Sequence, residues 1–294
     1  MPPAIEERRF TLTGPGSVPI AAYCWKTAAP VRGVLQIAHG LGEHACRYPP
    51  VLAPIFEAGF AVFANDHRGH GASARDISEL GSFGEGGFPA LVDDMARLTQ
   101  TAHSEYPGVP LILLGHSMGS FAAQLYMIEH GDSVDGVALS GSAALDGLLK
   151  ARAQAPDPFA FYNASFEPSR TAFDWLTRDE KIVDAYVADA RCGFQLDGPS
   201  RASLDQAAER LADPGALKRI RPDLPVYLLA GDADPINVKL SLLRLLMARY
   251  RQAGMTRLEY DFYPDARHEV LNEVNRDVVV RRLLDWMNRT LEGR

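Results

Sequence analysis

A serine between two glycines is the first candidate for chemistry in this sequence. Ser117 lies in GHSMG (115–119), directly after the apolar run Val109–Leu114, which is typical of a strand buried on both faces. Ser120–His130 then spaces most of its apolar residues as a helix does, and Gly131 is a suitable stop. A Gly-x-Ser-x-Gly sequence between a strand and a helix predicts a nucleophile elbow, a sharp turn that exposes the serine hydroxyl.

The glycines beside Ser117 have a steric reason. In so tight a turn, a Cβ at position 115 or 119 would collide with neighbouring backbone. The amide of Met118, at the start of the helix, would point to where an oxyanion forms. The same pattern also occurs as an ordinary turn, so the interpretation requires a base, an acid and a second amide elsewhere in the chain.

A catalytic serine needs a general base near neutral pH, and imidazole is the usual one. Of the 8 histidines, only His268 lies in a loop after the last predicted strand, which makes it the candidate base. His116 is next to Ser117 in the sequence, but we expect it to point away from the serine along the elbow.

The base needs an acid that holds its tautomer. Asp234 follows the predicted strand Pro225–Ala230, and sites in open α/β sheets gather at the carboxyl ends of strands. Asp232 is a less favoured rival, and both residues also suit an ordinary turn. The order Ser117, Asp234, His268 is the order found in α/β-hydrolases.

The second oxyanion amide should come from the glycine-rich turn HGLG (39–42), which follows the predicted strand Gly33–Ala38. Glycines on either side of Leu41 would let the chain approach a bound acyl group, so the Leu41 amide is the candidate. The alternative is a turn with no further role. In either case His39 is expected to be a structural hydrogen-bonding residue.

The elements that would position these residues alternate between strand and helix. A hairpin is predicted over Arg8–Thr13 and Val18–Trp25, and the other predicted elements are the strands Phe60–Ala64, Val134–Ser140 and Arg257–Tyr263 and the helices Tyr48–Glu57, Gly87–Tyr106, Lys239–Arg251 and Asn275–Leu291. This alternation predicts the α/β class, with a mostly parallel sheet of about eight strands and helices on both faces.

The alternation stops near Gly141 and resumes at Pro225. The intervening segment has no buried-strand run, and it contains the helical stretches Phe173–Ala190 and Ser203–Ala212. It is too long and too aromatic for a structureless loop. We therefore predict an α/β core over 1–141 and 214–294 and an inserted helical cap over 142–213.

Composition narrows the function classes. The net charge of −7 disfavours a nucleic-acid partner. The 3 cysteines are far apart and form no C-x-x-C, which predicts free thiols in a reducing compartment and no metal site built from cysteine. No signal peptide or membrane span is evident, so the expected location is the cytoplasm. The composition leaves open the oligomeric state and transient contact with a membrane surface through the cap.

The chain resembles the monoacylglycerol lipase and lysophospholipase branch of the α/β-hydrolases, which is also grouped with serine aminopeptidase-like hydrolases. The resemblance covers most of the chain and is carried by HGLGEH (39–44) with Arg47 and Tyr48, DHRGHGAS (66–73), GHSMGS (115–120), GDADPI (231–236), ARHEVLNE (266–273), and the cap pieces DWLTRD (174–179) and YVADARCGF (186–194). HGLGEH, DHRGHG and GHSMG are specific in combination.

The resemblance implies Ser117 as nucleophile, Asp234 as acid, His268 as base, and the amides of Leu41 and Met118 as the oxyanion hole. It also implies that Glu43, His44 and Arg47 support the oxyanion turn, and that His67 and His70 pack a loop and bind no metal. No cofactor is expected. The expected partner is a small lipid-like ester.

The cap is rich in aromatic residues, which suggests an apolar substrate site. The candidates are Phe159, Phe161, Phe166, Phe173 and Trp175. Some of them would only anchor the cap, and the others would line an acyl-chain tunnel. The favoured substrate is a monoacylglycerol, a lysophospholipid or a simple medium-chain ester.

Two other functions remain open at this stage. A serine aminopeptidase-type peptidase would use the same triad and would need acidic cap residues for a substrate ammonium group. A non-catalytic α/β-hydrolase serving as a receptor or scaffold usually lacks a triad residue. Here all three residues are present.

Overall fold

A single eight-stranded sheet forms the centre of the structure, with the strand order β1-β2-β4-β3-β5-β6-β7-β8. The computed structural model describes residues 4–153, 155 and 158–292. The strands are β1 (Glu6–Thr13), β2 (Pro19–Lys26), β3 (Gly33–Ala38), β4 (Phe60–Asn65), β5 (Leu111–His116), β6 (Gly136–Ser140), β7 (Val226–Gly231) and β8 (Leu258–Tyr263). β1 and β2 are an antiparallel hairpin, β2 also runs antiparallel to β4, and the strands from β4 to β8 are parallel. The predicted α/β class and strand number are confirmed.

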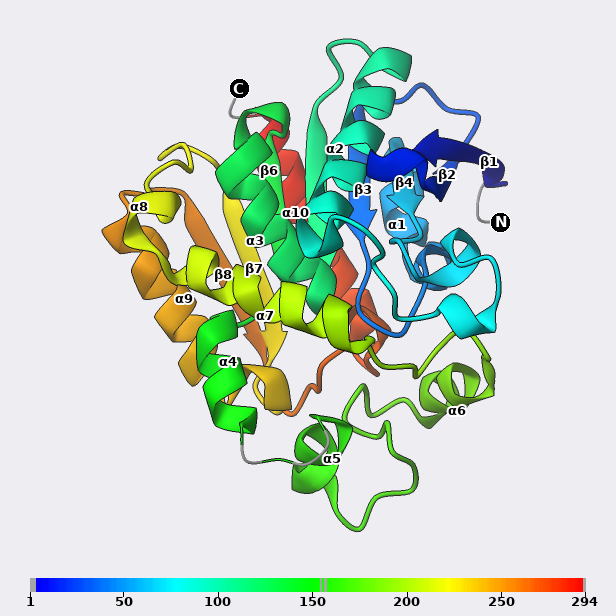
Figure 1. The fold of residues 1–294 in the computed structure, drawn as a ribbon. Coiled ribbons are helices and arrows are strands. Elements are labelled where there is room, and N and C mark those ends of the chain that lie inside the picture. Colours follow the sequence, from blue (N-terminus) through cyan, green and yellow to red (C-terminus); the bar gives the residue numbers. More distant parts are fainter. Residues whose placement is uncertain (1–3, 154, 156–157, 293–294) are drawn as a thin grey trace.

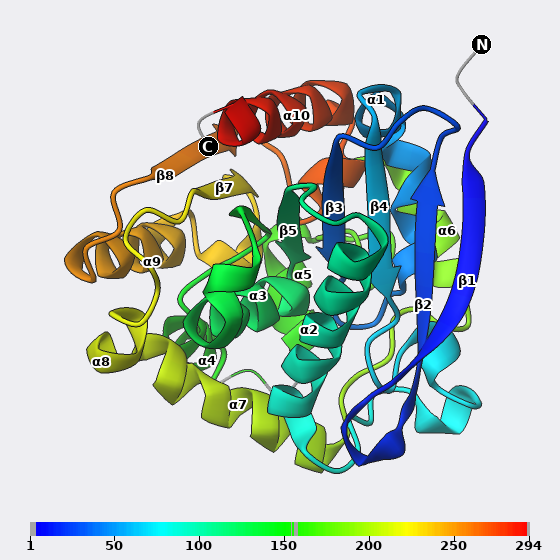
Figure 2. The ribbon, with the colours of Figure 1, turned by 90° about the horizontal axis from the view of Figure 1, so that it is seen from above.

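Helices cover both faces of this sheet (Figures 1 and 2). They are α1 (Ala53–Glu57), α2 (Gly87–Glu105), α3 (Met118–His130), α4 (Leu145–Arg152), α5 (Pro158–Asn163), α6 (Glu180–Ala188), α7 (Gly198–Ala212), α8 (Pro214–Leu217), α9 (Ser241–Gln252) and α10 (Arg276–Glu292). α1 and α10 pack on one face, and α2, α3 and α9 pack on the other. Alternate residues of β5 enter the two cores: Leu111 and Leu113 on one side, Ile112 and Leu114 on the other. A strand buried on both faces is therefore apolar at nearly every position.

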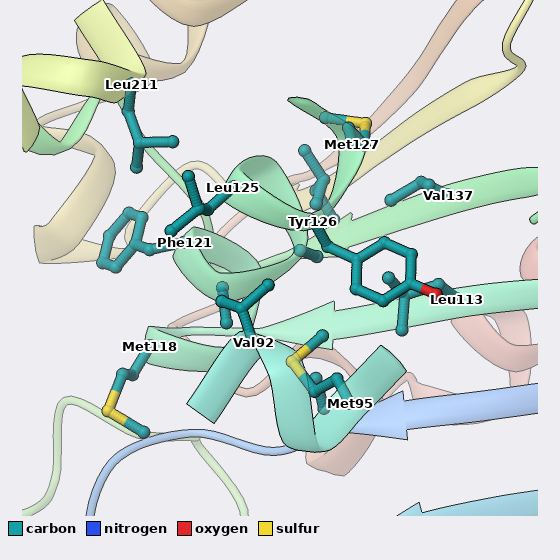
Figure 3. Packing of buried hydrophobic residues seen from close by; sticks show 14 of the residues in the cluster. Val92, Met95, Leu113, Met118, Phe121, Leu125, Tyr126, Met127, Val137 and Leu211 are labelled. Atoms are coloured by element: carbon teal, nitrogen blue, oxygen red, sulfur yellow. The ribbon is translucent and has the colours of Figure 1, made fainter. Parts of the chain in front are cut away.

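The segment between β6 and β7 is helical, and its described residues form no strand. α4, α5 and α6 lie at the end of the molecule to which the parallel strands point (Figure 1). α7 belongs to the same segment but packs beside α3, where Leu211 faces Phe121 and Leu125 (Figure 3). The segment thus both extends the core and covers the strand ends. The boundaries 142 and 213 remain a prediction.

Two helix predictions were wrong in extent. Helix was expected over Tyr48–Glu57, but a 3-10 turn at Pro49–Val51 precedes α1, because Pro49 and Pro50 lack the amide hydrogen that an α-helix uses. Helix was also expected over Phe173–Ala190, but α6 begins only at Glu180, after the N-cap Asp179. The residues before Asp179 use their backbone carbonyls in contacts with another loop, which are described below.

Three histidines form a buried layer in the loops that follow β3 and β4. His39, His67 and His70 are fully buried, and the ring centroids of His39 and His67 are 4.2 Å apart. His39 Nε2 accepts a hydrogen bond from the His67 amide at 2.9 Å, so its Nδ1 carries the proton and donates to the Gly40 carbonyl at 2.8 Å. Neutral histidine thereby holds the turn that begins at Gly40.

In the described part of the chain, no helix has both the length and the apolar character needed to cross a bilayer.

The buried histidine layer predicts loss of stability in acid. Burial lowers the pKa of His70 from 6.5 to about 3, so between these values the unfolded chain binds more protons than the folded chain. Stability should therefore fall as the pH is lowered through this range. At pH 4, His70 should contribute roughly 3 kcal/mol to this fall.

The free energy of unfolding, measured by denaturant titration from pH 7 to pH 4, tests this. His70→Gln should have a shallower pH dependence than the parent. His103→Gln, a half-exposed histidine near the end of α2, is the matched control and should keep the parental slope. Equal slopes for the parent and His70→Gln would contradict the assignment.

Candidate active site

Ser117 occupies the turn between β5 and α3 in a strained backbone conformation. Its φ is 53° and its ψ is −122°, outside the regions that non-glycine residues favour. A Cβ added at Gly119 would lie 2.1 Å from the Ala38 carbonyl oxygen, and one at Gly115 would lie 2.5 Å from the Gly119 carbonyl oxygen. The expected steric need for both glycines is confirmed. The turn is the sharp strand-to-helix elbow that the sequence predicts.

The structure brings Asp234 and His268 together across 34 residues of sequence. Asp234 Oδ2 lies 3.0 Å from His268 Nδ1, and both side chains are buried. Asp234 Oδ1 accepts the Ile236 amide at 2.9 Å, which fixes the carboxylate. The rival Asp232 instead accepts the Asp265 amide at 2.8 Å. An ionised carboxylate can only accept a hydrogen bond, so His268 Nδ1 carries the proton and donates to Asp234, and His268 Nε2 is left as an acceptor.

The imidazole of His268 is held between two aromatic rings. The centroid of the His116 ring lies 4.7 Å away, and that of the Trp175 ring lies 4.9 Å away. Because His116 directly precedes Ser117, this contact places His268 beside the elbow. His268 Nε2 is buried and has no hydrogen-bond partner among the residues that the structure describes. Burial, reinforced by the neighbouring His268, lowers the pKa of His116 to about 4, so His116 is neutral at pH 7.

The turn that contains Leu41 lies against the elbow. A Cβ added at Gly40 would come within 3.1 Å of the Ser117 Cβ. Within the described residues, the amides of Leu41 and Met118 donate to no protein acceptor, and both belong to the segments that meet here. Backbone N–H groups in such a position can bind an oxyanion.

A buried carboxylate fixes this turn. Glu43 Oε1 accepts the Gly40 amide at 2.5 Å and the Tyr48 hydroxyl at 2.8 Å, and Glu43 Oε2 accepts Arg47 Nη1 at 2.6 Å. Burial alone would raise the pKa of Glu43, but the Arg47 guanidinium more than offsets this effect, so the pKa is lowered. Glu43 therefore stays ionised.

Arg47 also binds the loop that carries His268. Its Nη1 and Nη2 donate to the two carboxylate oxygens of Glu269, each at 2.8 Å. This bidentate pair joins the turn after β3 to the residue that follows His268. Fork-to-fork pairing of this kind fixes orientation as well as distance.

The loop of His268 is paired in turn with the segment before α6. The amide of His268 donates to the Trp175 carbonyl at 3.3 Å, and that of Glu269 donates to the Leu176 carbonyl at 2.7 Å. These bonds use carbonyls that a helix over Phe173–Ala190 would have needed. The wrong helix prediction thus has a tertiary cause that local periodicity does not report.

Glu273 accepts hydrogen bonds from both segments at this junction. Its carboxylate is fully buried and accepts the amides of Arg178 and Arg267 at 3.2 and 2.9 Å and the Arg178 Nε at 3.0 Å. Glu273 belongs to the resembling sequence ARHEVLNE, but no role follows from its residue type alone. The one signal in the sequence is an acidic residue that ends a motif containing the candidate base. Its burial is visible only in the fold.

The five candidate substrate-binding aromatics lie in different surroundings. Trp175 contacts His268, and Phe159 lies next to it, with ring centroids 6.4 Å apart. Phe173 contacts Phe159 at 5.3 Å between centroids. Phe161 packs on Tyr162, and Phe166 lies under the Arg267 guanidinium. Trp175, Phe159 and Phe173 therefore form a continuous aromatic group that starts at His268.

Comparison with known proteins agrees with this geometry. The family model described as "Serine aminopeptidase, S33" matches residues 29–275. The chain is 29% identical over 285 residues to a monoacylglycerol lipase of Mycolicibacterium smegmatis, covering 94% of this chain and 95% of the relative. It is 24% identical over 277 residues to a probable lysophospholipase L2 of Haemophilus influenzae, covering 89% of this chain and 84% of the relative.

A solved structure is similar throughout. The crystal structure of a thermostable carboxyl esterase from Bacillus coagulans in complex with glycerol superposes with a TM-score of 0.86 at 27% identity, covering 97% of this chain and 99% of that chain. The family match spans well over half of the sequence and includes the elbow. The chain therefore belongs to the serine aminopeptidase S33 family of α/β-hydrolases and is a serine hydrolase.

Proposed function

We propose that the protein hydrolyses carboxylic esters with a single acyl chain, through an acyl-enzyme formed on Ser117. The observation that carries the proposal is the buried pair of Asp234 and His268, 3.0 Å apart, beside a serine in a strained elbow. This combination provides a nucleophile, a base in the correct tautomer and an acid that orients it. Relatives named as lipases, a lysophospholipase and an esterase support the same reaction class.

The reaction has two steps. Ser117 Oγ attacks the ester carbonyl while His268 Nε2 takes the hydroxyl proton, and Asp234 stabilises the imidazolium that results. The same proton then passes to the leaving alcohol as the C–O bond breaks. Water, deprotonated by His268, attacks the acyl-serine and releases the acid and the free serine.

The amides of Leu41 and Met118 would bind the oxyanion in both steps. The turn of Leu41 is fixed before substrate arrives, because His39 and Glu43 each hold the backbone of Gly40. Donors that are already oriented need not reorganise when charge develops, which is where most of their effect arises.

The aromatic group of Trp175, Phe159 and Phe173 supports an acyl chain as the substrate portion next to His268. An apolar chain gains free energy from burial against such rings. A glycerol or phosphoglycerol head group would then lie on the other side of the ester carbonyl, away from these rings. A monoacylglycerol or lysophospholipid, or a simple medium-chain ester, fits this description.

A peptidase that binds a substrate ammonium is supported less well. It needs free carboxylates in the cap, but several of the acidic residues there already have partners. Asp174 accepts the amides of Arg170 and Thr171, and Asp184 pairs with Arg170. Asp179 caps α6 and binds Arg276, and Glu167 binds Ser169.

Ser117→Ala tests the central claim. Loss of the nucleophile should reduce turnover of p-nitrophenyl esters by ~10⁴-fold or more. It should also abolish covalent labelling by a fluorophosphonate probe. Ser104→Ala, an exposed serine near the end of α2, is the matched control and should keep both properties. Parental activity in Ser117→Ala, or no labelling of the parent, would refute the proposal.

Asp234→Asn should leave the fold intact but stabilise the wrong imidazole tautomer. We expect turnover to fall by about 10⁴-fold. Asp232→Asn is a close control, since Asp232 binds the Asp265 amide and not the imidazole. Steady-state kinetics of the two variants should therefore differ by orders of magnitude. Similar losses in both would show that the acid is misassigned.

Chain length tests the acyl site. With glycerol monoesters of increasing length, kcat/KM should rise by about fourfold for each methylene that becomes buried, then level off when the site is full. Acetyl esters and aminoacyl amides are the comparison substrates. Activity confined to either of them would contradict an acyl-chain site without affecting the triad.

A further inference from the structure

Two segments far apart in sequence meet beside the turn that contains Leu41. One is the end of HGLGEH, with His44 just before the 3-10 turn Ala45–Arg47. The other is the loop after α6, where the Gly193 amide donates to the Gly42 carbonyl at 2.9 Å. This backbone bond ties the loop of the predicted cap to the turn that contains Leu41.

Three potential metal ligands converge at this junction. His44 Nε2 lies 2.9 Å from Asp189 Oδ2, and Cys192 Sγ completes a set in which all ligand atoms are within 4.8 Å of one another. Two hydrogen bonds within the loop after α6 hold Asp189 and Cys192 close together. Asp189 Oδ1 accepts the Arg191 amide at 2.8 Å, and the Asp189 carbonyl accepts the Cys192 amide at 2.9 Å.

We propose that His44, Asp189 and Cys192 bind one divalent transition-metal ion of the zinc class, with the fourth position open to water. Imidazole nitrogen, thiolate sulfur and carboxylate oxygen are the three ligand types that zinc takes in proteins. Bond lengths of about 2.0–2.3 Å in a tetrahedron separate ligand atoms by roughly 3.3–3.8 Å. The three donors need only small side-chain shifts to reach that arrangement.

Three carboxylates and one guanidinium lie around the junction. Glu43 and Glu269 lie close to Cys192, as does Asp189, and Arg47 is the cation that faces these three carboxylates. Coordination of a thiol by a metal ion displaces its proton, so Cys192 would bind as the thiolate.

The sequence predicts no metal site built from cysteine, because its cysteines are isolated and form no C-x-x-C. The proposal departs from that expectation because Cys192, 148 positions from His44, is brought beside it by the packing of the cap loop on the turn. His44, for which the resemblance implies support of the oxyanion turn, contacts Asp189 of the cap loop. An occupied site would fasten the cap loop to the turn.

Cobalt binding tests the site in the full-length protein after treatment with a chelator. Co²⁺ should bind one per chain, with a thiolate-to-cobalt charge-transfer absorption that Zn²⁺ removes by competition. Cys192→Ser should abolish this absorption. His44→Gln and Asp189→Asn should weaken Zn²⁺ binding by more than about tenfold. Cys46→Ser, at a half-buried cysteine outside the set, should bind as the parent does.

Thermal unfolding is the second measurement. Zn²⁺ should raise the midpoint of the parent and of Cys46→Ser, and leave that of Cys192→Ser unchanged. The absence of charge transfer in the parent, or its persistence in Cys192→Ser, would overturn the proposal. If Cys192→Ser does not fold, His44→Gln decides: unchanged affinity in that variant refutes the site. Neither readout depends on ester hydrolysis.

Discussion

The close approach of α3 to the end of β3 is the constraint on which the rest of the site depends. Gly119 leaves no room for a side chain beside the carbonyls of Ala38 and His39. Because the helix begins so close to β3, the chain must reverse within one residue, and Ser117 takes the strained conformation. The same approach brings the turn after β3 to within contact of the serine. One steric fact thus produces both the exposed nucleophile and the neighbouring amides.

Strain of this kind persists only if the surroundings hold the turn from several sides. In this protein, the side chains that fix the turn after β3 are buried and polar. The Gly40 carbonyl is bound by His39 and the Gly40 amide by Glu43. Glu43 and Glu269 share Arg47, so the oxyanion turn and the loop of the base are fixed relative to each other. Removing one partner of such a network leaves a buried charge without compensation, which commonly destabilises a protein by about 3–5 kcal/mol.

The sequence is informative where a residue type has few physical uses. Glycines around a serine, after an apolar run, have one common reason, so the elbow could be predicted. Asp234 could be preferred over Asp232 from its position after the strand, and the structure shows Asp234 bonded to His268. The sheet could be predicted because strands buried on both faces are apolar throughout.

The wrong helix prediction in the cap has a cause that lies outside any local stretch of sequence. The stretch Phe173–Ala190 has the apolar spacing of a helix, yet the carbonyls of Trp175 and Leu176 bind the loop of His268. The contact between the rings of His116 and His268 could not be predicted either. Both depend on contacts between residues far apart in the sequence, about 90 positions in the first case and 152 in the second. A short stretch of sequence does not contain both partners.

These contacts bear on how the segment after β6 should be divided. The residues from Trp175 to Asp179 are bonded to the loop of the base through two backbone hydrogen bonds and through Arg178 and Arg276. Moving them away would leave the fully buried Glu273 carboxylate without two of its four donors, the amide and Nε of Arg178. This part of the segment is therefore fixed to the loop that carries His268. An opening that admits substrate without that penalty must leave Trp175–Asp179 in place.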